Sequence, residues 1–230
     1  MQGTLEDALV RVFKRETPLS VAGRTDAGVH ALGQVVSLEG VPEDLDLEEL
    51  RTTLNRMCGP AVAVETAAYV PDDFNARFSA RSRTYCYAIL EGDTPDPFLA
   101  RTCWHHLETL DVDAMNEGAG HLLGNHDFGS FGRVPEEGAS TVRTLFELRT
   151  ERSGRIVRIT SRANAYIQQM VRSLVGTLVQ VGEGKRSPAE VAGILAARDR
   201  GAAGPVAPPH GLCLVSVEYD EGWSRPFDPF

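Results

Sequence analysis

Hydrophobic positions in the first third of the chain switch between a helical and a strand-like period. Thr4 precedes a stripe of apolar residues at helical spacing, and we predict a helix that Thr4 caps and Pro18 ends. The stripe consists of Leu5, Ala8, Leu9, Val12 and Phe13. Two apolar runs, 19–22 and 29–38, predict strands on either side of a short loop. A helix over 47–57 and a strand over 61–70 follow by the same reasoning.

The rest of the chain carries four further strand patterns and three helical ones. We predict strands over 84–90, 142–150, 156–163 and 211–219, the middle two forming a hairpin. We predict helices over 112–123 and 187–198, and a long one that begins at Asn164. We predict loops over the proline-bearing segment 92–98 and the polar segment 134–140, and we expect the second loop to be mobile.

The order of these elements predicts the fold class. Residues 1–70 give the order αββαβ, and residues 78–220 give βαββααβ. These orders indicate an α+β fold of two ferredoxin-like (RRM-like) halves with mainly antiparallel sheets. We place the halves at 1–76, which carries the loop between the two N-terminal apolar runs, and at 77–230. The first half lacks its opening strand, which we expect to lie upstream of Met1.

Composition narrows the class of protein. The contents of 42% hydrophobic and 24% charged residues are those of an ordinary globular protein. No apolar run approaches the ~20 residues of a membrane span, and the start is no signal peptide, so we expect a cytoplasmic location. The four cysteines form no Cys-x-x-Cys pair and indicate neither a disulfide frame nor a zinc site. Gly182–Lys185 lacks the spacing of a phosphate-binding loop.

The charge balance constrains the partners. A net charge of −9 argues against a protein that coats nucleic acid non-specifically, although a local cationic surface stays possible. The chain has 21 arginines and only 2 lysines, a composition that also suits work in high salt. Seven of the arginines lie between Arg143 and Arg172, against two glutamates. Their alternation along the predicted hairpin indicates either a local cationic surface or an ordinary solvated sheet face.

The loop between the two N-terminal apolar runs carries the first candidate chemistry. Gly23 and Gly28 bound it, and Arg24 and Asp26 lie two positions apart within it. A guanidinium beside a carboxylate could bind a phosphate while the carboxylate stays ionised. The alternative is a tight turn in which Asp26 bonds its own backbone and Arg24 points to water.

Two further segments hold charged residues in unusual surroundings. Arg77, Arg81 and Arg83 lead, without an acidic residue, into a strand that carries Tyr85. This pattern suits phosphate and base recognition, but it also suits a basic connection into a strand. Arg172 lies on the apolar stripe of the long helix, where an unpaired charge is costly, so we expect an internal carboxylate partner.

Three separated motifs resemble the tRNA pseudouridine synthase A family. They are Gly-Arg-Thr-Asp-Ala-Gly-Val-His around Asp26, Phe-Ser-Ala-Arg followed by Tyr-x-Tyr at Tyr85, and Asn-Ala-Tyr-x-x-x-Met-Val-Arg ending at Arg172. His126-Asp-Phe-Gly-Ser-Phe131 and the closing Gly-Leu-Cys-Leu segment also resemble that family. The resemblance covers essentially the whole chain. Tyr166 and the two glutamines after it depart from the commonest family pattern.

The resemblance implies an isomerase (an intramolecular transferase) that converts uridine to pseudouridine at positions 38 to 40 of the tRNA anticodon arm. It implies Asp26 as nucleophile, Arg172 as its ion-pair partner, and Tyr85 for base stacking or proton transfer. Arg24, Arg77, Arg81 and Arg83 are the expected RNA-binding residues. The resemblance also implies an active-site cleft between the two halves, and a homodimer with no metal or other cofactor and no membrane partner.

Two rival functions follow from the same residues. A non-catalytic RNA-binding relative, inactivated by the missing N-terminal strand, would keep the basic segments. Against it stand Asp26, Tyr85 and Arg172, which are all retained. A glycoside hydrolase would need a second carboxylate as its acid, and the sequence offers no motif for one.

Overall fold

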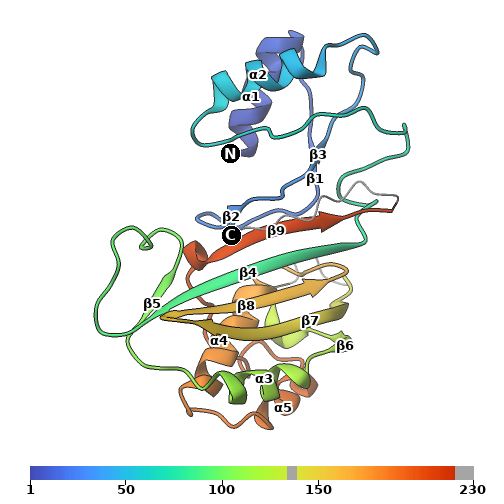
Figure 1. Ribbon diagram of the computed structural model, residues 1–230. Helices are drawn as coiled ribbons and strands as arrows, with labels where there is room; N and C mark the ends of the chain where they lie inside the picture. Colours follow the sequence, from blue (N-terminus) through green and yellow to red (C-terminus); the bar gives the residue numbers. More distant parts are fainter. Residues whose placement is uncertain (134–138, 221–230) are drawn as a thin grey trace. The chain divides into compact units, whose positions relative to one another are not determined.

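The computed structural model describes residues 1–133 and 139–220. Their contacts divide the chain into two compact units, and Figure 1 labels the elements of both. The first unit comprises Met1–Gly23 and Val35–Ser79. The second comprises Arg24–Gln34 and the described residues from Ala80 onward. The loop that carries Asp26 therefore packs with the second unit, although its sequence lies within the first eighty residues. Part of the predicted loop 134–140 falls outside the described residues.

The first unit pairs two helices with a short two-stranded sheet. Its elements are α1 (Gln2–Phe13), α2 (Leu47–Cys58), β1 (Ser20–Val21) and β3 (Val36–Ser37). The helices form the core through Leu9, Leu50 and Leu54, at the helical spacing that the sequence shows. Asp46 caps α2 through the amides of Glu48 and Glu49. Thr4 does not cap α1, since the helix already begins at Gln2.

The strand predicted over 61–70 is wrong. Residues 61–70 form no helix or strand. The side chain of Asn55 explains part of this, because it bonds both the amide and the carbonyl of Val64. Backbone groups that a neighbouring strand would pair are instead satisfied from α2.

The second unit is built on a seven-stranded sheet in the order β2-β9-β4-β8-β7-β6, with β5 also paired to β4. The strands are β2 (His30–Ala31), β4 (Ser82–Glu91), β5 (Trp104–His106), β6 (Gly124–Asp127), β7 (Val142–Ser153), β8 (Ile156–Ala163) and β9 (Leu212–Glu218). The pairs β2–β9 and β4–β5 are parallel, and the others are antiparallel. The mainly antiparallel sheet with separate helices confirms the α+β class.

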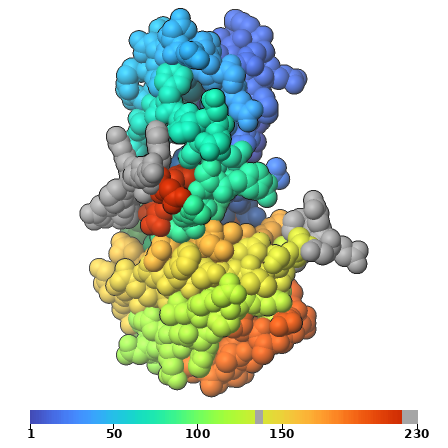
Figure 2. All heavy atoms as spheres, turned by 90° about the vertical axis from the view of Figure 1, so that its right-hand side faces the viewer, coloured from blue at the N-terminus to red at the C-terminus, as the bar shows by residue number. Residues whose placement is uncertain are grey.

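Three helices pack with this sheet: α3 (Val112–Gly120), α4 (Met170–Gly182) and α5 (Glu190–Ala197). They lie on one side of it in Figure 1, and Figure 2 shows β7, in yellow, next to α3, in light green. Short 3-10 turns cover 129–131 and 209–211. Phe128 and Phe131 are fully buried, so the aromatic motif that contains them contributes to the core. No helix of the described residues has both the length and the apolar character that crossing a membrane requires.

Two predicted boundaries in the second unit differ from the structure. The apolar run 29–38 divides into β2, which pairs with β9, and β3, which pairs with β1 in the first unit. The long helix begins at Met170 rather than at Asn164, because the Asn164 side chain accepts hydrogen bonds from the amides of Thr144 and Ala165. Gln169 has a left-handed conformation, with φ at 64°, immediately before the helix. The short strands β5 and β6 were not predicted.

Candidate active site

The Asp26 loop contains a hydrogen-bonded turn, and its C-terminal side is attached to the sheet of the second unit. The amide of Val29 donates to the carbonyl of Asp26 at 3.1 Å, and that of Leu32 donates to Leu214 on β9 at 2.9 Å. Gly28 has φ at +87°, and a Cβ there would lie 3.1 Å from the Pro209 ring. A glycine is thus required by both conformation and space at this position. The loop is a turn held in one place rather than a free connection.

Arg172 forms an ion pair with Asp26. Its Nη1 donates to Asp26 Oδ2 at 2.7 Å, and the two side chains are 13% and 27% exposed. The Nε of the same guanidinium donates to the carbonyl of Ala207 at 2.7 Å. Asp26 Oδ1 accepts no hydrogen bond from the part of the chain that the structure describes. One carboxylate oxygen is therefore oriented by the arginine, while the other stays available to a substrate.

The sequence predicts a turn over 205–209, but it does not predict that this turn contacts Arg172. The amide of Ala207 donates to the carbonyl of Arg172, so backbone and side chain of the arginine are both tied to the turn. A Cβ on Gly176 would lie 1.8 Å from the Pro205 carbonyl oxygen, so only glycine admits this approach. The signal available was a glycine on an otherwise apolar helix followed by a proline-rich turn.

Tyr85 lies on β4 within electrostatic range of Asp26. Its side chain is buried, with 7% of the residue exposed, and its ring packs edge-on against Tyr166 with centroids 5.2 Å apart. Burial raises the pKa of Tyr85 to about 12; the positive charge of Arg83 opposes that rise, and the negative charge of Asp26 adds to it. At neutral pH the phenol is therefore protonated. It offers a flat ring and a hydrogen-bond donor rather than a base.

The arginines named as RNA-binding residues lie in different surroundings. Arg24 is exposed and makes no hydrogen bond or ion pair with any described residue. Arg81 is exposed and pairs with Asp220. Arg83 is buried, and its Nη1 bonds the carbonyls of Ala80 and Asn164, which suits a structural role for that guanidinium. Arg77 belongs to the first unit, where it is exposed and lies over the ring of Phe78 at 5.3 Å.

The arginine-rich hairpin is balanced by carboxylates. Arg149 pairs with Glu147 at 3.0 Å and with Glu151 at 2.7 Å. Arg162 also lies within 4.0 Å of two carboxylates, those of Glu147 and Glu218. These contacts favour the interpretation of a solvated sheet face over that of a phosphate-binding surface.

Within the described residues, one group of side chains has the composition of a metal site, namely His106, Glu108 and Glu183. These residues lie in the second unit, and none belongs to the Asp26 arrangement. The sequence pattern did not single them out, because their ligand atoms come together only through folding.

Comparison with known proteins identifies relatives along the whole chain. The family model described as tRNA pseudouridine synthase matches residues 119–220. The tRNA pseudouridine synthase A of Acidiphilium cryptum (strain JF-5) is 46% identical over 233 residues, which cover 100% of this chain and 89% of the relative. That of Rhodopseudomonas palustris (strain BisA53) is 44% identical over 221 residues, covering 96% and 89%. That of Dinoroseobacter shibae is 44% identical over 234 residues, covering 100% and 90%.

Proposed function

The chain belongs to the tRNA pseudouridine synthase A family, and from this premise we propose that it isomerises uridine in the anticodon arm of tRNA, at one or more of positions 38, 39 and 40. The observation that supports the proposal most is the ion pair between Asp26 and Arg172 at 2.7 Å, next to a buried tyrosine. The ferredoxin-like form of the two halves belongs to the same proposal.

The proposed reaction conserves every atom of the nucleoside. The C1′–N1 bond of uridine breaks and a C1′–C5 bond forms. The proton on C5 is lost and N1 gains one, so the product is an isomer of the substrate. Asp26 is the proposed nucleophile: its carboxylate oxygen that accepts no hydrogen bond from the described residues attacks C1′ as the C1′–N1 bond breaks, and it leaves C1′ when the C1′–C5 bond forms. A covalent intermediate divides one difficult step into two easier ones.

Arg172 is proposed to hold that carboxylate in position. Its guanidinium bonds both Asp26 and the Ala207 carbonyl, so its direction is set by two contacts on different elements. Positioning of this kind matters because a displacement of about 1 Å at a reacting group costs roughly a hundredfold in rate.

Tyr85 and Arg24 are proposed to contact the nucleotide. The protonated Tyr85 can stack against the uracil ring or donate a hydrogen bond to it, since its pKa is about 12. Arg24 lies two residues from the nucleophile with an exposed guanidinium, which suits a backbone phosphate. Such a contact would help to hold the uridine out of its stack. The exposed Arg77 and Arg81 are proposed to contact tRNA phosphates. The buried Arg83 is proposed to support RNA binding indirectly, through its bonds to backbone carbonyls.

The proposal extends to assembly and location. We expect a homodimer that acts on tRNA in the cytoplasm, without a cofactor in the isomerisation. Sedimentation of the protein alone and with tRNA tests the oligomeric state. A monomer at every concentration would remove the dimer from the proposal and leave the chemistry untouched.

Incubation with unmodified tRNA transcripts tests the reaction. We expect carbodiimide mapping to show pseudouridine at positions 38, 39 or 40. A transcript with cytidine at those three positions serves as the control and should stay unmodified. Modification elsewhere in the control would contradict the anticodon-arm assignment. Binding of tRNA without any pseudouridine would instead favour the non-catalytic RNA-binding relative.

A further inference from the structure

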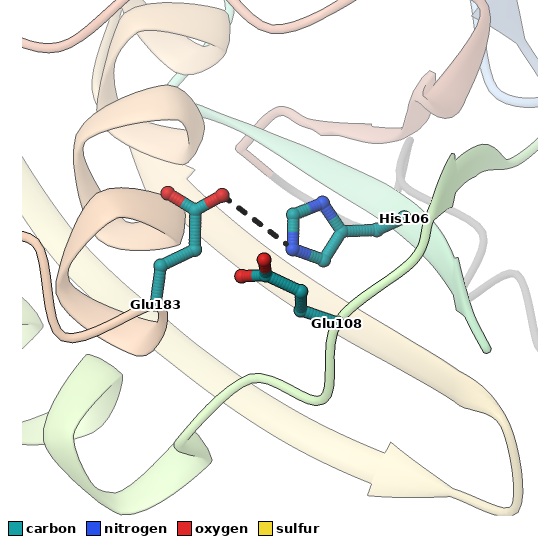
Figure 3. A group of neighbouring side chains, drawn as sticks. All are labelled: His106, Glu108 and Glu183. Carbon is teal, nitrogen blue, oxygen red and sulfur yellow. Dashed lines mark ion pairs between the residues drawn. The ribbon is translucent and has the colours of Figure 1, made fainter. Parts of the chain in front are cut away.

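A second cluster of charged side chains lies at the other end of α4 from Arg172. His106 ends β5, Glu108 follows two residues later, and Glu183 caps the C-terminus of α4. Figure 3 shows the imidazole and the two carboxylates directed toward one another. Arg172 and Glu183 are three helical turns apart, about 16 Å along the axis. The cluster is therefore separate from the Asp26 arrangement.

The Nε2 atom of His106 has no hydrogen-bond partner among the described residues, although it is buried. The nearest acidic atom is Glu183 Oε1 at 3.6 Å, which is too long for a hydrogen bond. The side chains of His106 and Glu183 are only 11% and 10% exposed. A buried ring nitrogen directed at two carboxylates is costly unless a cation or a proton lies between them.

The donor set suits a transition metal. The three ligand atoms lie within 4.8 Å of one another. Protein ligands of tetrahedral Zn²⁺ bind at about 2.0–2.2 Å, so neighbouring ligand atoms are about 3.3 Å apart. Glu108 is exposed on the segment after β5, so rotation of its side chain can bring its carboxylate to the shorter distance that zinc requires. An imidazole nitrogen among the ligands favours Zn²⁺ and related ions over Mg²⁺ or Ca²⁺.

The local field also favours a cation. Glu183 caps the C-terminus of α4, where the unpaired carbonyls of a helix concentrate partial negative charge. Lys185 lies in this field, with its Nζ 2.9 Å from Glu183 Oε2. The Lys185 side chain is 61% exposed and is free to swing into solvent. It is thus a competitor that a metal ion would displace.

We propose that His106, Glu108 and Glu183 bind a divalent transition metal of the Zn²⁺ class. The ion joins the end of β5 and the residues directly after it to the C-terminus of α4, two parts of the second unit that lie far apart in sequence. Water completes its coordination, because the chain supplies three ligands. The site is separate from the residues of the proposed isomerase chemistry.

Zinc titration of the full-length protein, stripped of metal with a chelator, tests the proposal. By calorimetry we expect one Zn²⁺ per chain, with a higher melting temperature in the bound state. Glu108→Gln should weaken binding by at least about tenfold, because it removes a ligand from an exposed position without disturbing the fold. His106→Gln should weaken it at least as much. Lys185→Ala should strengthen it by up to about fivefold, since it removes the competing cation.

His121→Gln is the matched control, because it removes an exposed histidine from the same unit. Its zinc affinity should equal that of the unaltered protein. The proposal is overturned if the unaltered protein binds no zinc, if Glu108→Gln and His106→Gln bind as tightly as the control, or if Lys185→Ala binds more weakly. Asp26→Asn should bind zinc normally, so failure of the isomerase proposal and failure of the metal proposal are distinguishable.

Discussion

At the scale of single residues, the carboxylate of Asp26 can be changed without altering its shape. We expect Asp26→Asn to lower pseudouridine formation by at least about 10⁴-fold, because an amide cannot attack as a nucleophile. Binding of tRNA and the melting temperature should change little by comparison. Single-turnover assays with mapped tRNA measure the loss.

Asp72→Asn is the control for that change, since it makes the same substitution at an exposed aspartate of the first unit. Its activity should match that of the unaltered protein. Turnover of Asp26→Asn within tenfold of the unaltered protein would take the nucleophile role away from Asp26.

Arg172 is a second residue whose role can be separated into charge and geometry. Arg172→Lys keeps the charge, but one ammonium cannot reproduce the bonds to Asp26 and Ala207, so we expect kcat to fall about a hundredfold. Arg172→Met should cost roughly 2–4 kcal/mol of unfolding free energy, somewhat less than a fully buried pair loses. Urea denaturation measures this cost.

A double-mutant cycle tests whether the two residues are coupled. Arg172→Met combined with Asp26→Asn should recover part of the lost stability, because no unpaired carboxylate remains. It should recover no activity. Strictly additive losses of unfolding free energy would show that the ion pair does not contribute to folding.

At the scale of elements, the end of β4 is joined to the segment before α3 by Glu91. Its buried carboxylate accepts hydrogen bonds from Arg152 on β7 and from the amide of Leu110. Burial alone would raise the pKa of Glu91, but the hydrogen bond from Arg152 and that from Leu110 outweigh it, so the pKa lies below its ordinary value. The lowered pKa means that folding favours the charged form.

The pH dependence follows from that direction. Glu91 stabilises the fold fully above the pKa of an unfolded glutamate, about 4.3, and this contribution is lost as the pH falls through the lower pKa of the folded state. We expect Glu91→Gln to reduce the unfolding free energy at pH 7 and to flatten its decline below pH ~4.5. Urea denaturation across this pH range measures both effects. An unchanged acid slope would show that another carboxylate causes the decline.

At the scale of the whole molecule, the chain has two cores rather than one. Leu9 lies in the core of α1 and α2, whereas Leu174 is buried on α4 in the second unit. Leu9→Ala should cost about 2–5 kcal/mol locally. We expect faster hydrogen exchange in α1 and α2, with β4 and β8 unchanged, and the reverse for Leu174→Ala. Equal loosening of both units by either change would contradict two separate cores.

Patterns that depend on neighbouring residues were predicted well from the sequence. The helix α2, the strand β4 and the hairpin of β7 and β8 were all expected close to their observed bounds. Each has a periodic apolar face, and periodicity records which side of an element is buried. The pairing of Arg172 with a carboxylate was expected because an unpaired guanidinium among apolar residues is costly.

Arrangements that depend on a distant partner were decided only by the tertiary structure. The run 29–38 joins two sheets because β9 and β1 each offer an edge to part of it. Residues 61–70 form no strand, since Asn55 takes backbone groups that a strand would pair. The cluster of His106, Glu108 and Glu183 exists only where β5 meets the end of α4. A residue pattern determines which face of an element is apolar. Which element packs against that face, and which group bonds each polar atom, depends on the tertiary structure.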